Sequence, residues 1–328
     1  MTFKVGGLFS GVGGIELGFQ KAGFDIAWAN EFDREACITY RKNSKHLLIE
    51  KDVYELKGSD LAPVDVLVAG FPCQAFSVAG KRKGFDDERG NLFFEIMRLV
   101  NELEERPKVI FLENVKNLKS HDNGNTFSRI ANIIEEQNDY SFFFNVMNTS
   151  EYTKVPQNRE RTFIIGFRDE AYWRFNPSGT MSAKFYKLFP PKKNPRIDPI
   201  QKYLEIGDID ESFFYRQDKY NFKELKESMK SKDTIYQWRR VYVRENKNNL
   251  CPTLTANMGT GGHNVPLILT DEGIRKLTPR ECFNFQGFPK SFKLDDKLSN
   301  SALYKQAGNS VSIPLITLLA KSIKACIS

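Results

Sequence analysis

One cysteine stands where the sequence could place a reactive group beside a substrate. Cys73 follows an apolar, β-branched run, residues 64–71, and a proline, Pro72. Ligands of open α/β sheets bind at the carboxyl ends of the strands, so a thiol just past such an end is a candidate nucleophile. The polar, glycine-rich residues 81–90 read as a loop that could close over a substrate.

The cysteine pattern argues against disulfide and zinc chemistry. Cysteines occur at positions 37, 73, 251, 282 and 326, an odd number with no C-x-x-C pair. In a chain of 328 residues this pattern predicts neither a disulfide framework nor a metal site. The default for any single cysteine is a small, buried, apolar residue.

An acid and two arginines follow at positions that could serve the same pocket. Glu113 comes directly after the apolar residues 108–112, and if their strand lies beside that of Cys73, thiol and carboxyl share one pocket. With no histidine in these turns, the pair does not suggest a protease. Arg159 and Arg161 could hold a carboxylate, a phosphate or a base carbonyl, or else form an ion pair with a neighbouring acid.

Near the N-terminus, glycines occupy a turn between a predicted strand and a predicted helix. Phe9-Ser10-Gly11-Val12-Gly13-Gly14 could bring the backbone close to a ligand, or be only a tight turn. A dinucleotide fingerprint starting at Gly11 would need glycine at position 16, where Glu16 stands. The spacing therefore counts against a nicotinamide cofactor and leaves open another cofactor that contains adenosine.

Two acids follow the next strands of the same region. Glu31 ends the second predicted strand, where an acid can accept ribose hydroxyls. Asp52 ends a predicted third strand and could accept from an adenine amino group. Each could instead cap a helix, a role for which Asp33 is the better candidate.

The elements that must position these residues alternate along the chain. Apolar runs of strand length and segments with helical spacing follow one another up to residue 167. We predict strands over residues 5–9, 25–30, 64–71, 109–112, 141–147 and 162–167, and helices over 14–22, 35–43, 92–105 and 127–137. This βαβα order predicts an α/β domain with a mostly parallel sheet.

The regular order stops near residue 175, and a basic, irregular region follows. Residues 179–276 hold 18 Lys and Arg against 12 Asp and Glu, an excess of 6 in a chain whose net charge is +7. Such a region suggests a polyanionic partner, or else only a solvated basic surface. An apolar helix predicted over 313–326 would expose its apolar face if it stood alone, so we expect it to pack on the first domain. We therefore predict one domain from residues 1–178 and 277–328, and a second from 179–276.

The ends and apolar runs of the sequence suggest where the protein works. No apolar run approaches the length needed to cross a bilayer, and the first residues lack the charged-then-apolar pattern of a signal peptide. We expect a soluble, cytoplasmic protein.

Taken in their order, these segments resemble the DNA cytosine-5 methyltransferase family, in particular the compact bacterial and phage enzymes of restriction–modification systems. The resemblance covers nearly the whole chain. It rests on Phe9-Ser10-Gly11-Val12-Gly13-Gly14, Asn30-Glu31-Phe32-Asp33, Gly70-Phe71-Pro72-Cys73-Gln74, Glu113-Asn114-Val115, Gln157-Asn158-Arg159-Glu160-Arg161, Arg280-Glu281-Cys282 with Gln286-Gly287-Phe288-Pro289, and Gly308-Asn309-Ser310-Val311. One such motif would be weak evidence, whereas this many in the family's order are very specific.

The resemblance implies a fold and a reaction. The fold is a Rossmann-like S-adenosylmethionine-dependent methyltransferase domain with a smaller, irregular target-recognition domain. In the reaction a cytosine flips out of duplex DNA, the Cys73 thiolate adds to C6, and C5 takes the methyl group, which leaves S-adenosylhomocysteine. Glu113 would bond the ring N3 and the exocyclic amine, Arg161 would hold the base carbonyl, and Arg159 would brace the site.

By the same correspondence, the cofactor contacts residues from both ends of the chain. They are Phe9, Ser10, Gly11, Val12, Gly13, Gly14, Glu31, Phe32, Asp52, Val53, Pro72, Leu92, Asn309, Ser310 and Val311. The partner is double-stranded DNA, and the residues assigned to it are Gln74, Ser77, Arg239, Arg240, Arg244, Thr253 and Leu254, with 255–264 as a recognition loop. The resemblance implies a monomer that uses neither a metal ion nor a membrane.

Three other functions fit parts of the same pattern. A methyltransferase of this family that acts on tRNA would have a smaller, differently patterned recognition region. A sequence-specific DNA-binding protein without catalysis is disfavoured by Cys73, Glu113 and the glycine turn. A redox or nicotinamide enzyme with a reactive cysteine is disfavoured by Glu16 and by the missing C-x-x-C pair.

Overall fold

The chain folds into two compact units in the computed structural model, which describes residues 2–71, 92–137, 139–169, 177–219, 221–239, 241–260 and 265–328. The first unit comprises Met1–Met147, Glu160–Pro191 and Leu315–Ser328. The second comprises Asn148–Arg159 and Lys192–Pro314.

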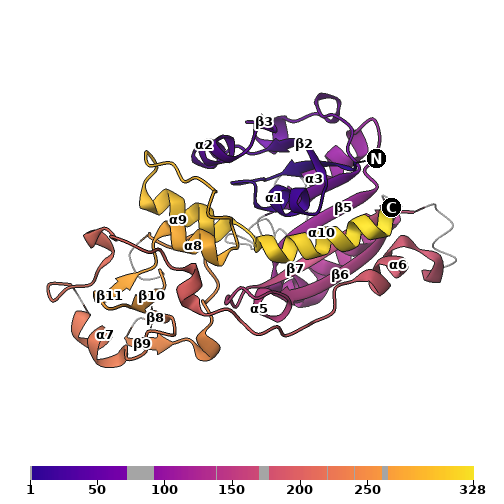
Figure 1. Cartoon of the computed structure of the whole chain (residues 1–328). Helices are drawn as coiled ribbons and strands as arrows, with labels where there is room; N and C mark the ends of the chain where they lie inside the picture. Colours follow the sequence, from indigo (N-terminus) through magenta and orange to yellow (C-terminus); the bar gives the residue numbers. More distant parts are fainter. Residues whose placement is uncertain are drawn as a thin grey trace. The chain divides into compact units, whose positions relative to one another are not determined.

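A seven-stranded sheet forms the centre of the first unit (Figure 1). In the order β3-β2-β1-β4-β5-β7-β6, its strands are Leu47–Ile49, Asp25–Asn30, Lys4–Leu8, Val66–Gly70, Val109–Val115, Glu160–Arg168 and Tyr140–Asn148. The pairs from β3 to β5 are parallel, and β7 runs antiparallel to β5. The chain builds outward from β1 in one direction and from β4 in the other, and sheets of this kind bind ligands where the two central strands end.

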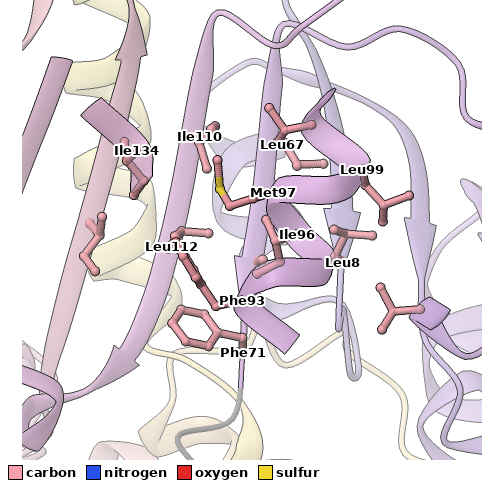
Figure 2. Packing of buried hydrophobic residues seen from close by; sticks show 14 of the residues in the cluster. Leu8, Leu67, Phe71, Phe93, Ile96, Met97, Leu99, Ile110, Leu112 and Ile134 are labelled. Atoms are coloured by element: carbon pink, nitrogen blue, oxygen red, sulfur yellow. The ribbon is translucent and has the colours of Figure 1, made fainter. Parts of the chain in front are cut away.

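Helices cover this sheet because their apolar side chains repeat at helical spacing. They are α1 Gly14–Lys21, α2 Arg34–Asn43, α3 Leu92–Glu102, α4 Asn125–Asn132, α6 Met181–Leu188 and α10 Ile313–Ile327. On α3, Phe93, Ile96, Met97 and Leu99 are buried and point toward strand residues such as Leu67 (Figure 2). The core that results holds the carboxyl ends of β4 and β5 in fixed positions.

The C-terminal helix packs on the first helix of the chain. A Cβ added at Gly18 of α1 would lie 2.4 Å from Cγ2 of Ile316 in α10, so the two helices touch backbone to side chain. Near the end of α10, Lys324 donates a hydrogen bond of 2.8 Å to the carbonyl of Gly23. Glycine at position 18 is therefore required by this close approach.

One apolar stretch is longer than the sequence analysis expected. Residues Asn300–Ile327 are long and apolar enough to cross a bilayer by length and composition, which corrects the expectation that no run reaches that length. The stretch is two helices separated by an extended Ser310, and 56% of its most apolar window is buried. The core helices of globular proteins have the same composition, so burial inside the fold accounts for it.

The second unit has a small sheet of its own. Its order is β11-β10-β8-β9, and the strands are Ile274–Lys276, Leu267–Leu269, Tyr236–Arg239 and Tyr242–Glu245. The sheet packs with α7, Phe222–Ser228, around a core of Leu225, Met229, Tyr236, Trp238, Leu267 and Ile274. Helices α8, Pro279–Phe285, and α9, Asn300–Asn309, belong to the same unit.

The boundaries of the two compact units differ from those of the predicted functional domains. Residues 148–159 and 277–314 belong to the second unit, whereas the sequence assigned them to the catalytic domain. Compactness alone does not say which residues bind DNA or cofactor. The functional division into 1–178 with 277–328 and 179–276 stays a prediction.

Predicted and observed elements of the α/β region agree closely. Strands occur at each of the positions predicted for them, and the predicted helices begin within two residues of their expected starts. Two ends differ. The third strand ends at Ile49 rather than at Asp52, and the helix predicted over 127–137 begins at Asn125 and becomes a π-helix from Ile133.

Candidate active site

The glycine-rich turn after β1 has an unusual backbone. Phe9, Gly11 and Gly13 have φ values of 54°, 55° and 86°, in the left-handed region. For Phe9 this conformation is strained, and such strain is often found at ligand sites. A Cβ added at Gly11 would meet nothing within 4 Å, so the turn faces open space there. The turn thus leaves its backbone accessible at the carboxyl edge of the sheet.

Glu31 holds this turn in place. Its Oε2 accepts a hydrogen bond of 2.8 Å from the Gly11 N–H. Its Oε1 accepts from the N–H groups of Phe32 and Asp33, at 2.9 and 2.8 Å. A carboxylate can accept about four hydrogen bonds, so Glu31 keeps capacity for a ligand hydroxyl. Glu31 therefore lies where the sequence analysis placed it, with a role in the loop that the sequence did not show.

The neighbouring acids serve as helix caps. Asp33 accepts from the N–H groups of Glu35 and Ala36 at the start of α2, which confirms it as a cap. Asp52 accepts from Tyr54 N–H at 3.1 Å and caps the short 3-10 helix Val53–Glu55. A carboxylate has two oxygens and can accept about four hydrogen bonds, so capping and ligand binding are compatible for Asp52.

Phe32 and Val53 differ in how they could meet a cofactor. Phe32 is 67% exposed, which is unusual for a large aromatic side chain and suits a ring that stacks on a flat ligand. Val53 is buried, and Leu92 is the first residue of α3. These three residues and Asp52 all belong to the first unit.

A buried acid beneath the turn was missed by the sequence analysis. Glu16 occupies the position where a dinucleotide fingerprint would have glycine, and its side chain is only 2% exposed. A Cβ added at Gly7 would lie 2.0 Å from its Oε1 and 2.8 Å from the Ser10 hydroxyl. Burial raises the pKa of Glu16 to about 7. The signal in the sequence was a single acid on the apolar face of the first helix.

Glu113 and Arg161 form an ion pair at the ends of their strands. Arg161 Nε lies 3.0 Å from Glu113 Oε1, and the two side chains are 14% and 11% exposed. Gly70 is the register partner of Glu113, and the Asn114 side-chain amide donates to the Phe71 carbonyl at 3.0 Å. The strand of Glu113 therefore lies beside the strand that leads to Cys73, which confirms the condition set from the sequence.

Some site residues named from the sequence lie outside the described residues. They are Pro72, Cys73, Gln74, Ser77 and Arg240, together with residues 261–264 of the expected recognition loop. The four other cysteines, Cys37, Cys251, Cys282 and Cys326, are buried free thiols, and burial raises the pKa of each. For these four, the interpretation as packing residues is confirmed.

Arg159 joins three segments of the second unit. It is 2% exposed and donates to the carbonyls of Leu254 and Gly308, at 2.9 and 3.3 Å, and to that of Ser310. The residue before it, Asn158, accepts from the Thr253 hydroxyl at 2.6 Å. Arg159 and Arg161 are two residues apart but differ in their partners, since Arg159 binds distant carbonyls and Arg161 binds the Glu113 carboxylate and the carbonyl of its neighbour Glu160.

The residues expected to contact DNA are of two kinds. Arg239 and Arg244 are exposed on the paired strands β8 and β9, on the face opposite the buried Trp238. Thr253 is half-buried, and Leu254 is fully buried with its carbonyl bound to Arg159. The contact of Thr253 and Leu254 with DNA stays a prediction.

Comparison with known proteins agrees with this arrangement. The profile of C-5 cytosine-specific DNA methylases matches residues 3–325. Type II methyltransferase M.Bsp6I of Bacillus sp. (strain RFL6) is 52% identical over 325 residues, which cover 98% of either chain. Type II methyltransferase M.HhaI of Haemophilus parahaemolyticus is 36% identical over 96% of this chain and 92% of its own. The solved structure of the Entamoeba histolytica methyltransferase EhMeth shares the fold, with a TM-score of 0.75 at 19% identity over 100% of this chain and 99% of its own.

The fold and the edge of the sheet thus define an S-adenosylmethionine-dependent methyltransferase of the α/β class. Within that class, the chain belongs to the C-5 cytosine-specific DNA methylase family. It is a DNA cytosine-5 methyltransferase, and its curated relatives are Type II methyltransferases of bacteria. The resemblance found in the sequence is confirmed.

Proposed function

We propose that this enzyme modifies a specific duplex sequence with Cys73 as nucleophile and with Glu113 and Arg161 holding the target cytosine. The observation that carries the proposal is the Glu113–Arg161 pair, 3.0 Å apart, beside Gly70 at the end of β4. Cys73 follows Gly70 by three residues in the sequence. Since the other four cysteines are buried thiols with raised pKa values, Cys73 is the remaining candidate.

The chemistry needs both a nucleophile and a group that accepts the charge that develops. The Cys73 thiolate adds to C6 of the cytosine, and the displaced ring electrons move toward C5 and N3. A proton on Glu113 at N3 supports this adduct, and Arg161 orients the Glu113 carboxyl while facing the base carbonyl. S-adenosylmethionine supplies the electrophilic methyl group that C5 takes up. Loss of the C5 proton and expulsion of the thiolate then restore the aromatic ring and free the enzyme.

Residues of the first unit suit the cofactor. The turn Phe9–Gly14 leaves open space at Gly11, Glu31 keeps a free acceptor site, and Phe32 exposes its ring. These are the features that an adenosine ribose and base require, namely a close backbone, a hydroxyl acceptor and a flat apolar surface. Asp52 and Val53 complete this set, and the assignment of Pro72, Leu92, Asn309, Ser310 and Val311 stays a prediction.

The biological role follows from the relatives. We propose that the enzyme protects host DNA as the modification partner in a restriction–modification system, because its curated relatives are named Type II methyltransferases. The substrate would be double-stranded DNA, recognised through residues 179–276 with Arg239 and Arg244 on their exposed face. An enzyme that methylates the host's own DNA would act in the cytoplasm.

Methyl transfer with labelled S-adenosylmethionine and unmethylated duplex DNA tests the proposal. Cys73→Ala should abolish transfer, while Cys326→Ala, which removes a buried thiol, should retain it. Glu113→Gln should slow transfer by about 10²–10⁴-fold, the usual range for a general acid, and Glu160→Gln should not. A duplex with 5-fluorocytosine should trap a covalent adduct with wild type and none with Cys73→Ala. Methyl transfer to tRNA alone would overturn the proposal in favour of a tRNA methyltransferase. DNA binding without any methyl transfer would overturn it in favour of a DNA-binding protein without catalysis.

A further inference from the structure

Glu16 is a buried acid for which the proposed mechanism has no use. It is the third residue of α1, and neither of its carboxyl oxygens has a hydrogen-bond partner among the described residues. The Ser10 hydroxyl and the backbone N–H of Glu16 are the polar groups nearest the carboxyl, and both oppose the rise of its pKa by less than burial raises it. An unpaired buried acid is costly for a fold, so its place directly under the cofactor turn calls for a ligand.

The charges around Glu16 are of one sign. The charged group that acts on it is Glu31, at the end of β2, which disfavours ionisation of Glu16. From α2, the Tyr40 phenol faces it and feels its charge in turn. Among the described residues, neither Glu16 nor Glu31 has a lysine or arginine within ion-pair distance. Two acids and, among the described residues, no protein cation therefore adjoin the turn.

A cationic ligand would supply the missing partner. S-adenosylmethionine carries a sulfonium and an ammonium cation against one carboxylate, so it brings one net positive charge. S-adenosylhomocysteine has the same shape without the sulfonium charge and is neutral overall. We propose that Glu16 makes this site prefer the charged cofactor over the neutral product, and so favours product release. The inference rests on the proposed cofactor site at residues 9–14 and 31.

The size of the effect follows from Coulomb's law. A carboxylate within about 10 Å of a cation, in a partly buried site, changes a binding constant roughly tenfold. The effect needs Glu16 to be ionised. Because its pKa in the ligand-free protein is about 7, binding of a cation should lower that pKa and release a proton near neutral pH. Binding of the neutral product should not release a proton from this group.

Calorimetric titration with three ligands tests the proposal directly. The ligands are S-adenosylmethionine, S-adenosylhomocysteine and sinefungin, which has a protonated amine at the place of the sulfonium. At about pH 8, Glu16→Gln should raise the dissociation constants of the two cationic ligands roughly tenfold and leave that of S-adenosylhomocysteine unchanged. Glu104→Gln, which removes an exposed acid of the same unit, should change none of them.

The outcomes separate the inference from the proposed function. An equal change for all three ligands, or no change for any, would overturn the role of Glu16 while leaving the cofactor site intact. If the wild-type protein binds none of the three, the proposed cofactor site itself fails. Wild type alone gives a second readout, because titration at pH 7 in two buffers with different ionisation enthalpies measures proton release. More protons should be released with sinefungin than with S-adenosylhomocysteine, and equal release would count against the proposal.

Discussion

Two acids of the glycine-rich turn are held in opposite ways. Glu31 accepts hydrogen bonds from three backbone N–H groups, whereas burial is the dominant influence on Glu16. Desolvation penalises the charged form of a carboxyl group, so the pKa of Glu16 rises to about 7. Glu16 therefore keeps its proton at slightly acidic pH.

Glu16 should make the ligand-free protein less stable as the pH rises. The folded protein keeps the Glu16 proton up to a pKa of about 7, whereas the unfolded chain loses it near the ordinary glutamate pKa of 4.5. Stability falls with pH wherever the folded state binds more protons than the unfolded state. A shift of this size corresponds to about 3 kcal/mol, lost between about pH 4.5 and 7.

Urea unfolding of wild type and Glu16→Gln at about pH 5 and pH 8 measures this loss. The variant cannot titrate, so its advantage over wild type should grow by up to about 3 kcal/mol between the two pH values. Glu104→Gln, at an exposed position, serves as the control. A difference that is the same at both pH values would show that Glu16 does not titrate in this range.

At the scale of elements, regular segments were predictable and their long-range partners were not. The strands ending at Leu8, Asn30 and Gly70 follow from apolar runs, and with them the places of the glycine turn, Glu31 and the segment of Cys73. Local periodicity says nothing of contacts such as that between Arg159 and Leu254, which are 95 residues apart. The burial of Glu16 was missed for the same reason, because it depends on what packs over α1.

Arg159 is the clearest case of an element held by one side chain. Its guanidinium binds the carbonyls of Leu254, Gly308 and Ser310, which come from two distant segments of the second unit. The planar guanidinium presents five donors in a fixed fork, which a lysine cannot reproduce. Arg159 thus positions the segment that contains Ser310 within the second unit.

Removal of the Arg159 guanidinium should destabilise the second unit. Arg159→Met leaves buried carbonyls unpaired, so the free energy of unfolding should fall by about 3 kcal/mol or more. Arg159→Lys should recover only part of that loss. Arg216→Met is the matched control, because Arg216 is exposed and its ion pair with Glu211 should contribute less than about 1 kcal/mol. Chemical unfolding followed by tryptophan fluorescence measures the differences, and equal losses for the two methionine variants would contradict the positioning role.

For the whole molecule, the distribution of charge matters more than its sum. Of the net charge of +7, an excess of 6 lies within residues 179–276. The sequence could show this asymmetry but not which side chains face outward, because that depends on how the strands pair. Pairing of β8 with β9 buries Trp238 on one face and leaves Arg239 and Arg244 exposed on the other.

This exposed pair should govern how DNA binding depends on salt. The logarithm of the association constant falls linearly with that of the salt concentration, with a slope of about −0.9 for each phosphate contact. If Arg239 and Arg244 bind phosphates, alanine at either position should reduce the slope by about 1 and weaken binding to every duplex alike. If either reads a base edge, its variant should lose about 1–3 kcal/mol on the target duplex only. Lys4→Ala is the control, because Lys4 is an exposed cation at the start of β1 in the first unit, and it should change neither quantity. If Lys4→Ala has an equal effect, the net charge alone draws the enzyme to DNA.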